Sequence, residues 1–403
     1  MSLIGNAEHQ KRLNAYFDRI GRILGHQRRR EAFEQYTIGL FSDIERKSVE
    51  PIAALICQDP TLCRTYTEKL LHFVGDSKWD DRAVRLSCAR YALDAMTQRE
   101  PIQCWIFDDT GFMKQGDKSP GVQRQYTGSA GKTTNCQIGV SLALTTQTLE
   151  LPIDMDLYLP QCWAEDGARC RAARIPSEVG YRPKWQIALD LARRAVDAGI
   201  AKGLVLADSG YGDTGTFRAG LQELGLSYAV GVKQHAQVRI ACCDGTLSDV
   251  MNVATVADVL GAKEYRKTTW RQGTRRALHS RFAAVRVHVV NHGQFDSNEQ
   301  WLLIERPDIN QAPVHYTLST LPKSLSRKQL VRRIKQRWRI ERTYEDMKGE
   351  LGLDHYEGRS YPGWHHHVTV VLACYAFAVA ERAQAFSPQT RRTQTDDSFA
   401  VAA

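Results

Sequence analysis

The sequence lacks the segments that would send the chain into a membrane or out of the cell. Its start, MSLIGNAEHQKRL, has no apolar stretch of the kind that a secretory signal needs. The best candidate for a membrane span, VTVVLACYAFAVA at 368–380, is 13 residues long. That length is too short for about 30 Å of hydrocarbon and instead predicts a buried helix. We therefore expect a soluble, cytoplasmic protein.

Zinc and nucleotide sites are also missing from the sequence. The ten cysteines show no zinc-binding spacing, so we expect free, mostly buried thiols. The segment GSAGKTT at 128–134 imitates a phosphate-binding loop, but Tyr126 stands where that motif requires glycine. It predicts a turn between strands and no ATP site. The run His365–His367 does not favour a metal site, because consecutive helical residues point in different directions.

Positive charge is what the sequence has in excess. The 403 residues carry a formal net charge of +9, and the isoelectric point is about 9.0. A hydrophobic content of 43% is ordinary for a globular protein and excludes wholesale disorder. The charge favours an acidic partner, with nucleic acid as the first candidate. Arg28–Arg30 and YRKTTWRQGTRR at 265–276, where basic residues flank Tyr265 and Trp270, are candidate DNA contacts.

Changes in hydrophobic period divide the chain into five segments. Residues 1–100 show helical spacing and predict a helical N-terminal domain, which we expect to bind DNA. Residues 101–233 alternate apolar strands with amphipathic helices and predict the first part of a mixed α/β sheet covered on both faces. Residues 234–322 have the alternation of an antiparallel, β-rich insertion. Residues 323–385 return to helices and complete the core, and 386–403 form a polar tail with the composition of disorder.

Two predicted strands lead into acidic residues. The apolar stretch CWIF at 104–107 leads into Asp108, Asp109 and a Thr-Gly turn, and LVLA at 204–207 leads into Asp208. Ligands and reactive groups of such sheets gather outside the carboxyl ends of the strands. Asp108 and Asp208 are therefore candidate site residues. Asp109 is the alternative to Asp108, because neighbouring strand residues face opposite sides and only one can point at a shared ligand.

A basic helix predicted over 324–353 supplies a third carboxylate, Glu341. At about 100° per residue, Arg337 and Lys348 lie within about 40° of Glu341 on one helical stripe. Carboxylates that converge from two strands and a helix suit two Mg²⁺ ions, with Mn²⁺ as an alternative, since hard cations prefer carboxylate oxygens. Two metals about 4 Å apart can activate an attacking oxygen and stabilise a leaving one during displacement at phosphorus.

The set Asp108, Asp208 and Glu341 resembles the DDE triad of bacterial insertion-sequence transposases, which have an RNase H-like core. Arg337, Glu341 and Lys348 match the spacing of one branch's signature, Tyr-x2-Arg-x3-Glu-x6-Lys, although Ile334 takes the place of the tyrosine. The stretches DDTGFMKQG, GVQRQYTGSAGK, LYLP and LADSGYGD are also similar to DDE superfamily endonucleases. The resemblance covers about 30–385.

The resemblance implies an RNase H-like α/β sheet flanked by helices, interrupted by the β-rich insertion. It also implies an enzyme that cuts DNA at the ends of an insertion sequence and joins the freed 3′-OH to a target by Mg²⁺-dependent transesterification. Asp108, Asp208 and Glu341 would be the catalytic residues and metal ligands. The expected partner is double-stranded DNA, with a homodimer formed on it and a nucleoid-associated location. The residues expected to contact DNA are Arg337, Lys348, Arg124 and Lys132.

Two other functions remain open at this point. A catalytically silent DNA-binding protein derived from such an enzyme would keep the same charge. A metal-dependent nuclease would use the same carboxylates for hydrolysis without joining. Metal-dependent nicking distinguishes the silent protein from an enzyme, and a joining assay distinguishes the nuclease from a transposase.

Overall fold

The computed structural model describes residues 7–57, 59–242, 245–272, 277–291 and 294–385. The chain divides into two compact units. Unit 1 combines Met1–Ile102, Asp109–Pro183 and Glu341–Ala403, and unit 2 combines Gln103–Asp108 and Lys184–Ile340. The units interleave along the sequence, so their borders differ from those of the predicted domains. The predicted disordered tail, 386–403, lies outside the described residues.

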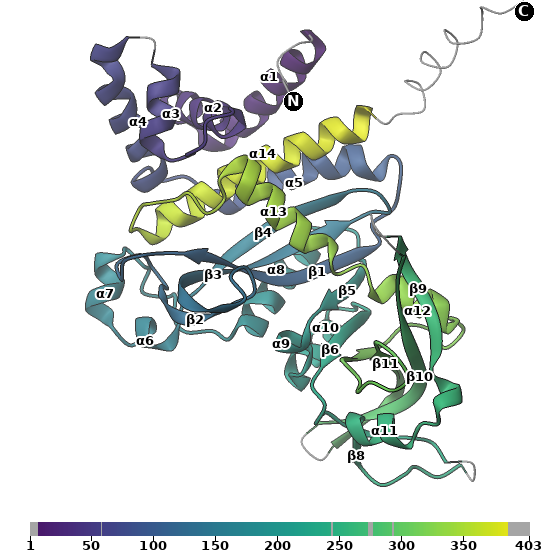
Figure 1. Cartoon of the computed structure of the whole chain (residues 1–403). Coiled ribbons are helices and arrows are strands. Elements are labelled where there is room, and N and C mark those ends of the chain that lie inside the picture. The colour runs from purple at the N-terminus through teal and green to yellow at the C-terminus, as the bar shows by residue number, and fades with distance from the viewer. Residues whose placement is uncertain (1–6, 58, 243–244, 273–276, 292–293, 386–403) are drawn as a thin grey trace, which may run out of the picture. The chain divides into compact units, whose positions relative to one another are not determined.

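Helices form the N-terminal part of unit 1, and the helical reading of this segment is confirmed. They are α1 (Ala7–Leu24), α2 (Gln27–Phe41), α3 (Val49–Ile56), the 3-10 turn η1 (Pro60–Leu62), α4 (Cys63–Gly75) and α5 (Asp81–Thr97). The last of them begins at a capping side chain, since Asp80 Oδ1 accepts a hydrogen bond from Ala83 N at 2.9 Å. Figure 1 shows these helices in purple and blue.

One long helix, α14 (Tyr361–Ala385), packs along α5 in unit 1 (Figure 1). It contains the apolar run at 368–380 and, with 25 residues, extends well beyond it. Within the described ranges it is the one helix long and apolar enough to cross a membrane by length and composition. However, 78% of its most apolar window is buried inside the protein, as predicted for a core helix.

One antiparallel part of the sheet and several further helices complete unit 1. Its strands are β2 (Gln123–Thr127), β3 (Lys132–Thr145) and β4 (Glu150–Tyr158), followed by the short helices α6 (Gln161–Ala164) and α7 (Gly167–Ala172). β3 pairs with β2 and β4 and also neighbours β1 (Cys104–Met113), which both units share. The helix α13 (Arg339–Leu351) is anchored to this sheet, because the hydroxyl groups of Tyr344 and Ser141 are 2.6 Å apart.

Unit 2 contains the parallel strands. β1 pairs in parallel with β5 (Leu204–Ala207), and β5 pairs in parallel with β6 (Tyr228–Val232). The connecting helices are α8 (Lys184–Asp197), α9 (Ser209–Gly212) and α10 (Gly215–Glu223). Val205 and Leu206 are buried, at 0% and 1% exposure, because both faces of a parallel sheet are covered.

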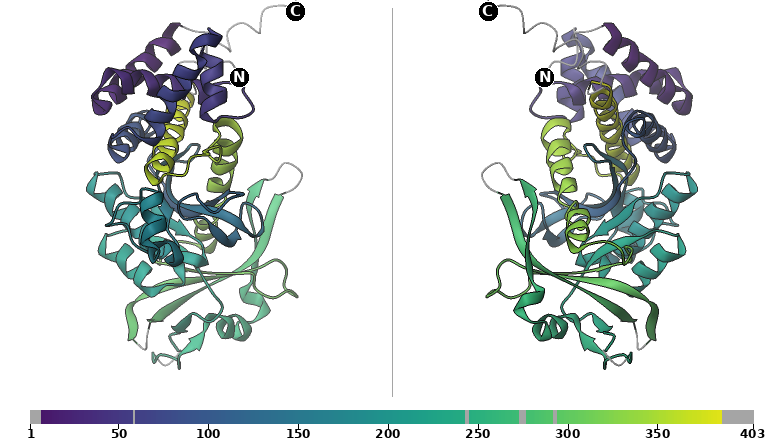
Figure 2. Two further views of the ribbon diagram at one scale, coloured as in Figure 1. Left: turned by 90° about the vertical axis from the view of Figure 1, so that its left-hand side faces the viewer. Right: turned by 90° about the vertical axis from the view of Figure 1, so that its right-hand side faces the viewer.

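The antiparallel insertion predicted after β6 is present in unit 2. It contains β7 (Gln237–Arg239), β8 (Met251–Asn252), α11 (Val253–Val259), η2 (Ala262–Glu264), β9 (Arg266–Gln272), β10 (Ala277–Asn291), β11 (Gln294–Arg306) and β12 (His315–Ser319), and α12 (Arg327–Ile334) follows it. Figure 2 shows the long strands β10 and β11 side by side, and β12 returns the chain to β6. The predicted fold class, a mixed α/β RNase H-like fold with a β-rich insertion, is confirmed.

Candidate active site

Asp108, in β1, and Asp208, directly after β5, occupy matching positions along two neighbouring parallel strands of unit 2. The register pairs Ile106 of β1 with Leu206 of β5, and each aspartate follows its paired residue by two positions. The backbone of Asp208 is still extended, with φ −81° and ψ −175°. Because side chains repeat every two residues along a strand and adjacent strands lie about 4.8 Å apart, both carboxylates extend from the same face of the sheet.

The turn predicted at Asp108 is wrong, because β1 continues to Met113. Thr110 and Phe112 are buried, at 2% and 1% exposure, and β3 neighbours β1, which pairs with β5 only over its first part. A neighbouring strand thus overrides the local turn preference of a Thr-Gly pair. Asp108 is 9% exposed, and Asp109 is half-buried on the opposite side of the strand.

Close packing fixes the turn that follows β5. Asp208 caps α9, since its Oδ1 accepts a hydrogen bond from Gly210 N at 2.8 Å. A Cβ atom on Gly231 of β6 would lie 2.8 Å from Ser209 N, and one on Gly212 would lie 2.3 Å from Gly231 O. Neither position has room for a side chain, so the backbone around Asp208 is held directly against β6.

Arg337 contacts Asp108. Its Nη1 donates a hydrogen bond to Asp108 Oδ2 at 2.9 Å, and the two side chains are 32% and 12% exposed. A guanidinium and a carboxylate at this distance form a charge-assisted pair. The sequence predicted Asp108 as a metal ligand and Arg337 as a DNA contact. In the structure the two side chains form an ion pair with each other.

The single basic helix predicted over 324–353 is wrong. The structure has two helices there, α12 and α13, separated by a turn at Lys335–Trp338. Arg337 lies in this turn and not on the helical stripe of Glu341. Ile334, which replaces the signature tyrosine, ends α12 and packs against the buried side chains of Phe282, Leu303 and Val331.

Contacts with distant strands of unit 2 hold the turn in place. Lys335 Nζ lies 2.7 Å from Glu305 Oε2 and 4.7 Å from the centre of the Trp270 ring. The guanidinium of Arg271 lies 3.4 Å from the centre of the Trp338 ring. These partners lie thirty or more residues away in sequence, on strands of the insertion. Helical periodicity therefore could not indicate the break.

Glu341 and Lys348 lie two turns apart on α13, in unit 1. Glu341 is exposed in the first turn of the helix. Lys348 Nζ donates hydrogen bonds to Gly111 O at 2.7 Å and Ser129 Oγ at 3.1 Å. Burial lowers the pKa of the Lys348 ammonium. Lys348 thus contacts protein groups here, although the sequence predicted it as a DNA contact.

The predicted metal ligands offer oxygen atoms only, which is the donor set that Mg²⁺ prefers. The pairing of Asp108 with a guanidinium shows that this carboxylate accepts a cation in its surroundings. Across the described parts of the chain, no group of three or more His, Cys, Asp or Glu side chains is close enough to hold a metal ion.

The other two predicted DNA contacts, Arg124 and Lys132, lie on the β2–β3 hairpin of unit 1. Both side chains are exposed. The segment 128–131 between the strands forms the turn that the sequence predicted in place of a phosphate-binding loop. Tyr126, between these two cations in the sequence, is 64% exposed. Sequence reasoning passed over it, although the alternation Arg-Gln-Tyr indicated that Arg124 and Tyr126 share a face.

Tyr265, predicted as a base-stacking residue, is not available for that role. It is 3% exposed, its hydroxyl donates a hydrogen bond to Ala257 O at 3.1 Å, and the Arg306 guanidinium covers its ring. Its surroundings form the core of the insertion. Residues 273–276 of the same basic segment lie outside the described residues.

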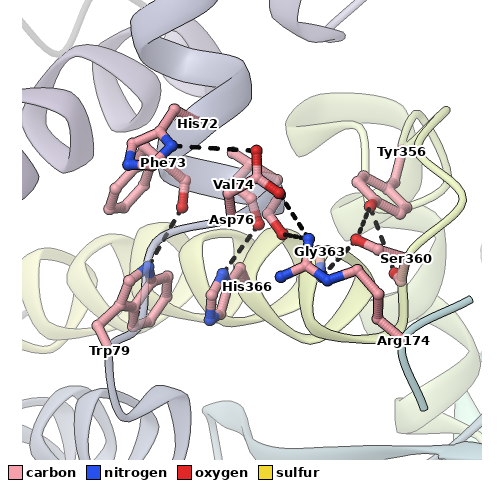
Figure 3. Close-up of polar contacts among 11 residues, drawn as sticks. His72, Phe73, Val74, Asp76, Trp79, Arg174, Tyr356, Ser360, Gly363 and His366 are labelled. Atoms are coloured by element: carbon pink, nitrogen blue, oxygen red, sulfur yellow. Dashed lines mark hydrogen bonds and ion pairs between the residues drawn. The ribbon is translucent and has the colours of Figure 1, made fainter. Parts of the chain in front are cut away.

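The three consecutive histidines of α14 have three separate surroundings. His366 Nδ1 donates a hydrogen bond to Val74 O at 2.8 Å, and its ring stacks 4.0 Å from Trp79 (Figure 3). His367 bonds Tyr36 Oη at 2.9 Å and Gly352 O at 3.0 Å. Burial lowers the pKa of His365 and of His367 to about 4, so both are neutral at pH 7.

The core is a mixed α/β sheet with carboxylates at matching positions of two parallel strands. Residues 19–277 match the family described as DDE superfamily endonuclease, and residues 182–377 match the transposase DDE domain. The first match covers more than half of the chain, so the chain belongs to the DDE superfamily of endonucleases. The predicted relation to the insertion-sequence transposases of this superfamily is confirmed.

One relative is a probable transposase for the insertion sequence element IS701 from Microchaete diplosiphon. It is 32% identical to this chain over 211 residues, which cover 52% of this chain. The chain matches about half the length of that relative, 50% of it.

Proposed function

We propose that this protein cuts DNA at the ends of an insertion sequence and joins the freed 3′-OH ends to target DNA. Asp108, Asp208 and Glu341 are the proposed catalytic carboxylates. The observation that carries this proposal is the register of β1 and β5, which sets two of the carboxylates at one level of the sheet. The family matches add support, because the first spans Asp108 and Asp208 and the second spans Asp208 and Glu341.

The chemistry follows from these groups. Bound Mg²⁺ at the carboxylates would polarise the phosphate and lower the pKa of an attacking hydroxyl. Asp208 keeps its orientation because its turn is packed against β6. In cleavage, a water oxygen bonds to phosphorus as the bond to the 3′-oxygen breaks. In joining, the freed 3′-oxygen attacks phosphorus of the target and displaces a target 3′-oxygen, so the number of phosphodiester bonds is conserved.

Arg337 has two roles in this proposal. Without metal it neutralises the charge of Asp108 through the 2.9 Å contact. With Mg²⁺ bound at Asp108, the guanidinium would instead bind a phosphate of the DNA, since Arg pairs with carboxylates and phosphates alike.

Double-stranded DNA is the proposed partner. The net charge of +9 and the exposed cations Arg124 and Lys132 support it. We assign additional DNA contact to the helices of 1–100, whose surface carries Arg28. Cutting and joining two ends together requires two copies of the active site, so a dimer on DNA is part of the proposal.

The test is a nicking and joining assay on DNA that carries the ends of the parent element, with Mg²⁺. The Asp208→Asn and Glu341→Gln variants should lose both nicking and joining while DNA binding in EDTA persists. Asp109→Asn is the matched control and should keep activity, because its side chain faces the other side of β1. Wild-type nicking by Asp208→Asn would disprove the triad. Binding without nicking by the wild type selects the silent DNA-binding protein, and nicking without joining selects the nuclease.

A further inference from the structure

The β2–β3 hairpin presents one cation and one aromatic ring side by side. On β2, Arg124 and Tyr126 are exposed, whereas Thr127 next to them is buried, at 1% exposure. The register places Tyr126 opposite Thr133 and Thr127 opposite Lys132. Two residues along a strand span about 7 Å on one face, so the guanidinium and the phenol ring can meet neighbouring groups of one partner.

Three exposed side chains of this hairpin are available to a partner. Within the described ranges, the side chains of Arg124, Tyr126 and Lys132 make no hydrogen bond, ion pair or ring contact. Tyr126 is 64% exposed, the largest exposed fraction of any Phe, Tyr or Trp in the described chain. An aromatic ring beside free cations is the arrangement by which proteins bind nucleic acid strands, through base stacking and phosphate contacts.

The charge of the hairpin favours the same partner. From Lys118 to Leu149 the sequence contains no aspartate or glutamate, while it contains Lys118, Arg124 and Lys132. The chain as a whole has 45 acidic residues among 403, so such a stretch stands apart from its surroundings. A basic segment without acidic residues is complementary to a phosphate backbone.

The hairpin is fastened to the helix that carries Glu341. Lys348 Nζ bonds Ser129 Oγ in the hairpin turn and Gly111 O in β1, at 3.1 and 2.7 Å. Ser129 Oγ in turn lies 3.1 Å from Thr110 Oγ1 and accepts a hydrogen bond from Gly111 N at 3.3 Å. Thr127 packs on β1 where a Cβ atom on Gly111 would lie 2.1 Å from its Oγ1. All these residues belong to unit 1.

We propose that the β2–β3 hairpin is a DNA-contact arm in which Tyr126 stacks on an unpaired base and Arg124 and Lys132 hold the adjoining phosphates. Lys348 is a positioning residue that fixes this arm to α13 and does not itself contact DNA. The proposal rests on the proposed function, because bases at a cut DNA end fray and become unpaired.

The test measures binding of the full chain to fluorescent DNA by anisotropy in EDTA, so that no catalysis takes place. One probe is a duplex with a single-stranded 3′ overhang, and the other is the blunt duplex. We expect the wild type to prefer the overhang. Tyr126→Ala should weaken binding to the overhang probe about tenfold and remove the preference, whereas Tyr126→Phe, which keeps the ring, should retain both.

The cation of the arm has its own readout. Arg124→Ala should reduce the salt dependence of binding by about one phosphate contact. Arg193→Ala is the matched control, because it removes an exposed arginine, 49% exposed, from α8 in unit 2. Its salt dependence should equal that of the wild type.

Combined substitutions test Lys348. If Lys348→Gln acts by loosening the arm, its effect on overhang binding should be absent in a background that carries Arg124→Ala, Tyr126→Ala and Lys132→Ala, since all contacts of the arm are then lost. An undiminished effect of Lys348→Gln in that background would show that Lys348 contacts DNA directly and would overturn its positioning role.

The outcomes separate this inference from the proposed function. A wild type that binds overhang and blunt DNA equally, or a Tyr126→Ala variant that keeps the preference, overturns the arm while DNA binding and nicking stand. A Tyr126→Phe variant as weak as Tyr126→Ala overturns the stacking role. A wild type that binds no DNA overturns the proposed function and the arm together.

Discussion

Two turns of the candidate site are held in place by different kinds of contact. The turn after β5 is held mainly by residues near it in sequence, whereas the turn at Lys335–Trp338 is held by residues far from it in sequence. Asp208 is held by its neighbours in sequence and by the adjacent strand, through Gly210 N and the close approach of Gly231. Lys335 is held by Glu305, on a strand of the insertion. The position of Asp208 can therefore be recognised from local sequence. The position of Arg337 beside Asp108 depends on contacts that local sequence does not contain.

The largest expected effect concerns the locally fixed carboxylate. Asp208→Asn should reduce DNA nicking by about a thousandfold or more, because it removes a charged metal ligand. The free energy of unfolding should change little, because asparagine caps a helix as well as aspartate does. Nicking rates at saturating Mg²⁺ and urea denaturation of the same samples measure the two quantities.

Asp80→Asn is the matched control, since Asp80 also caps a helix, α5, through Ala83 N at 2.9 Å. It should leave both nicking and stability near the wild-type values. Equal loss of nicking in the two variants would show that capping, and not metal binding, explains the effect.

The second effect tests whether the turn after β5 is as tightly held as its geometry indicates. In Gly212→Ala, the new Cβ atom would lie 2.3 Å from Gly231 O, and backbone has to move to accept it. We expect a loss of about 3 kcal/mol in the free energy of unfolding, the upper end for overpacking. Gly261→Ala, where a Cβ meets nothing within 4 Å, should stay within about 0.5 kcal/mol in the same urea experiment.

The sequence predicted the parts of this protein that local pattern determines. Hydrophobic patterns in neighbouring residues predicted three elements correctly. These are the apolar strand before Asp208, the antiparallel strands β10 and β11, and the buried helix α14. It failed at Asp108, where the partner strand β3 overrides a Thr-Gly turn signal. It failed again at Arg337, because the contacts that end α12 come from other strands.

The buried histidines of α14 extend this contrast, because their protonation is set by distant partners. The unfolded chain binds a proton at His367 below pH 6.5, whereas the folded chain does so only below about 4. Stability is therefore complete above pH 6.5 and is lost as the pH falls toward 4, by about 2 kcal/mol between pH 6.5 and 5 for this histidine. Urea denaturation across this range measures the slope.

His367→Gln should reduce the slope of the unfolding free energy against pH by the amount that one proton contributes. This holds even if the variant is less stable at every pH. His72→Gln is the control, since the His72 side chain is 70% exposed and makes one contact, with Asp76 at 3.9 Å. A slope that is unchanged in His367→Gln would mean that other groups cause the acid sensitivity.

The smallest effect tests the cation held by long-range contact. Arg337→Ala removes a partly exposed ion pair with Asp108 and should cost about 1 kcal/mol in the absence of metal. Because Arg337 then no longer competes for Asp108, Mg²⁺ should raise the melting temperature of this variant more than that of the wild type. Lys335→Ala breaks the neighbouring pair with Glu305 and should be destabilised equally with and without Mg²⁺.

Equal Mg²⁺ stabilisation of wild type and Arg337→Ala would show that the arginine and the metal do not share Asp108. The turn between α12 and α13 would then have a structural role only, whereas the turn after β5 would still position the proposed metal ligand Asp208.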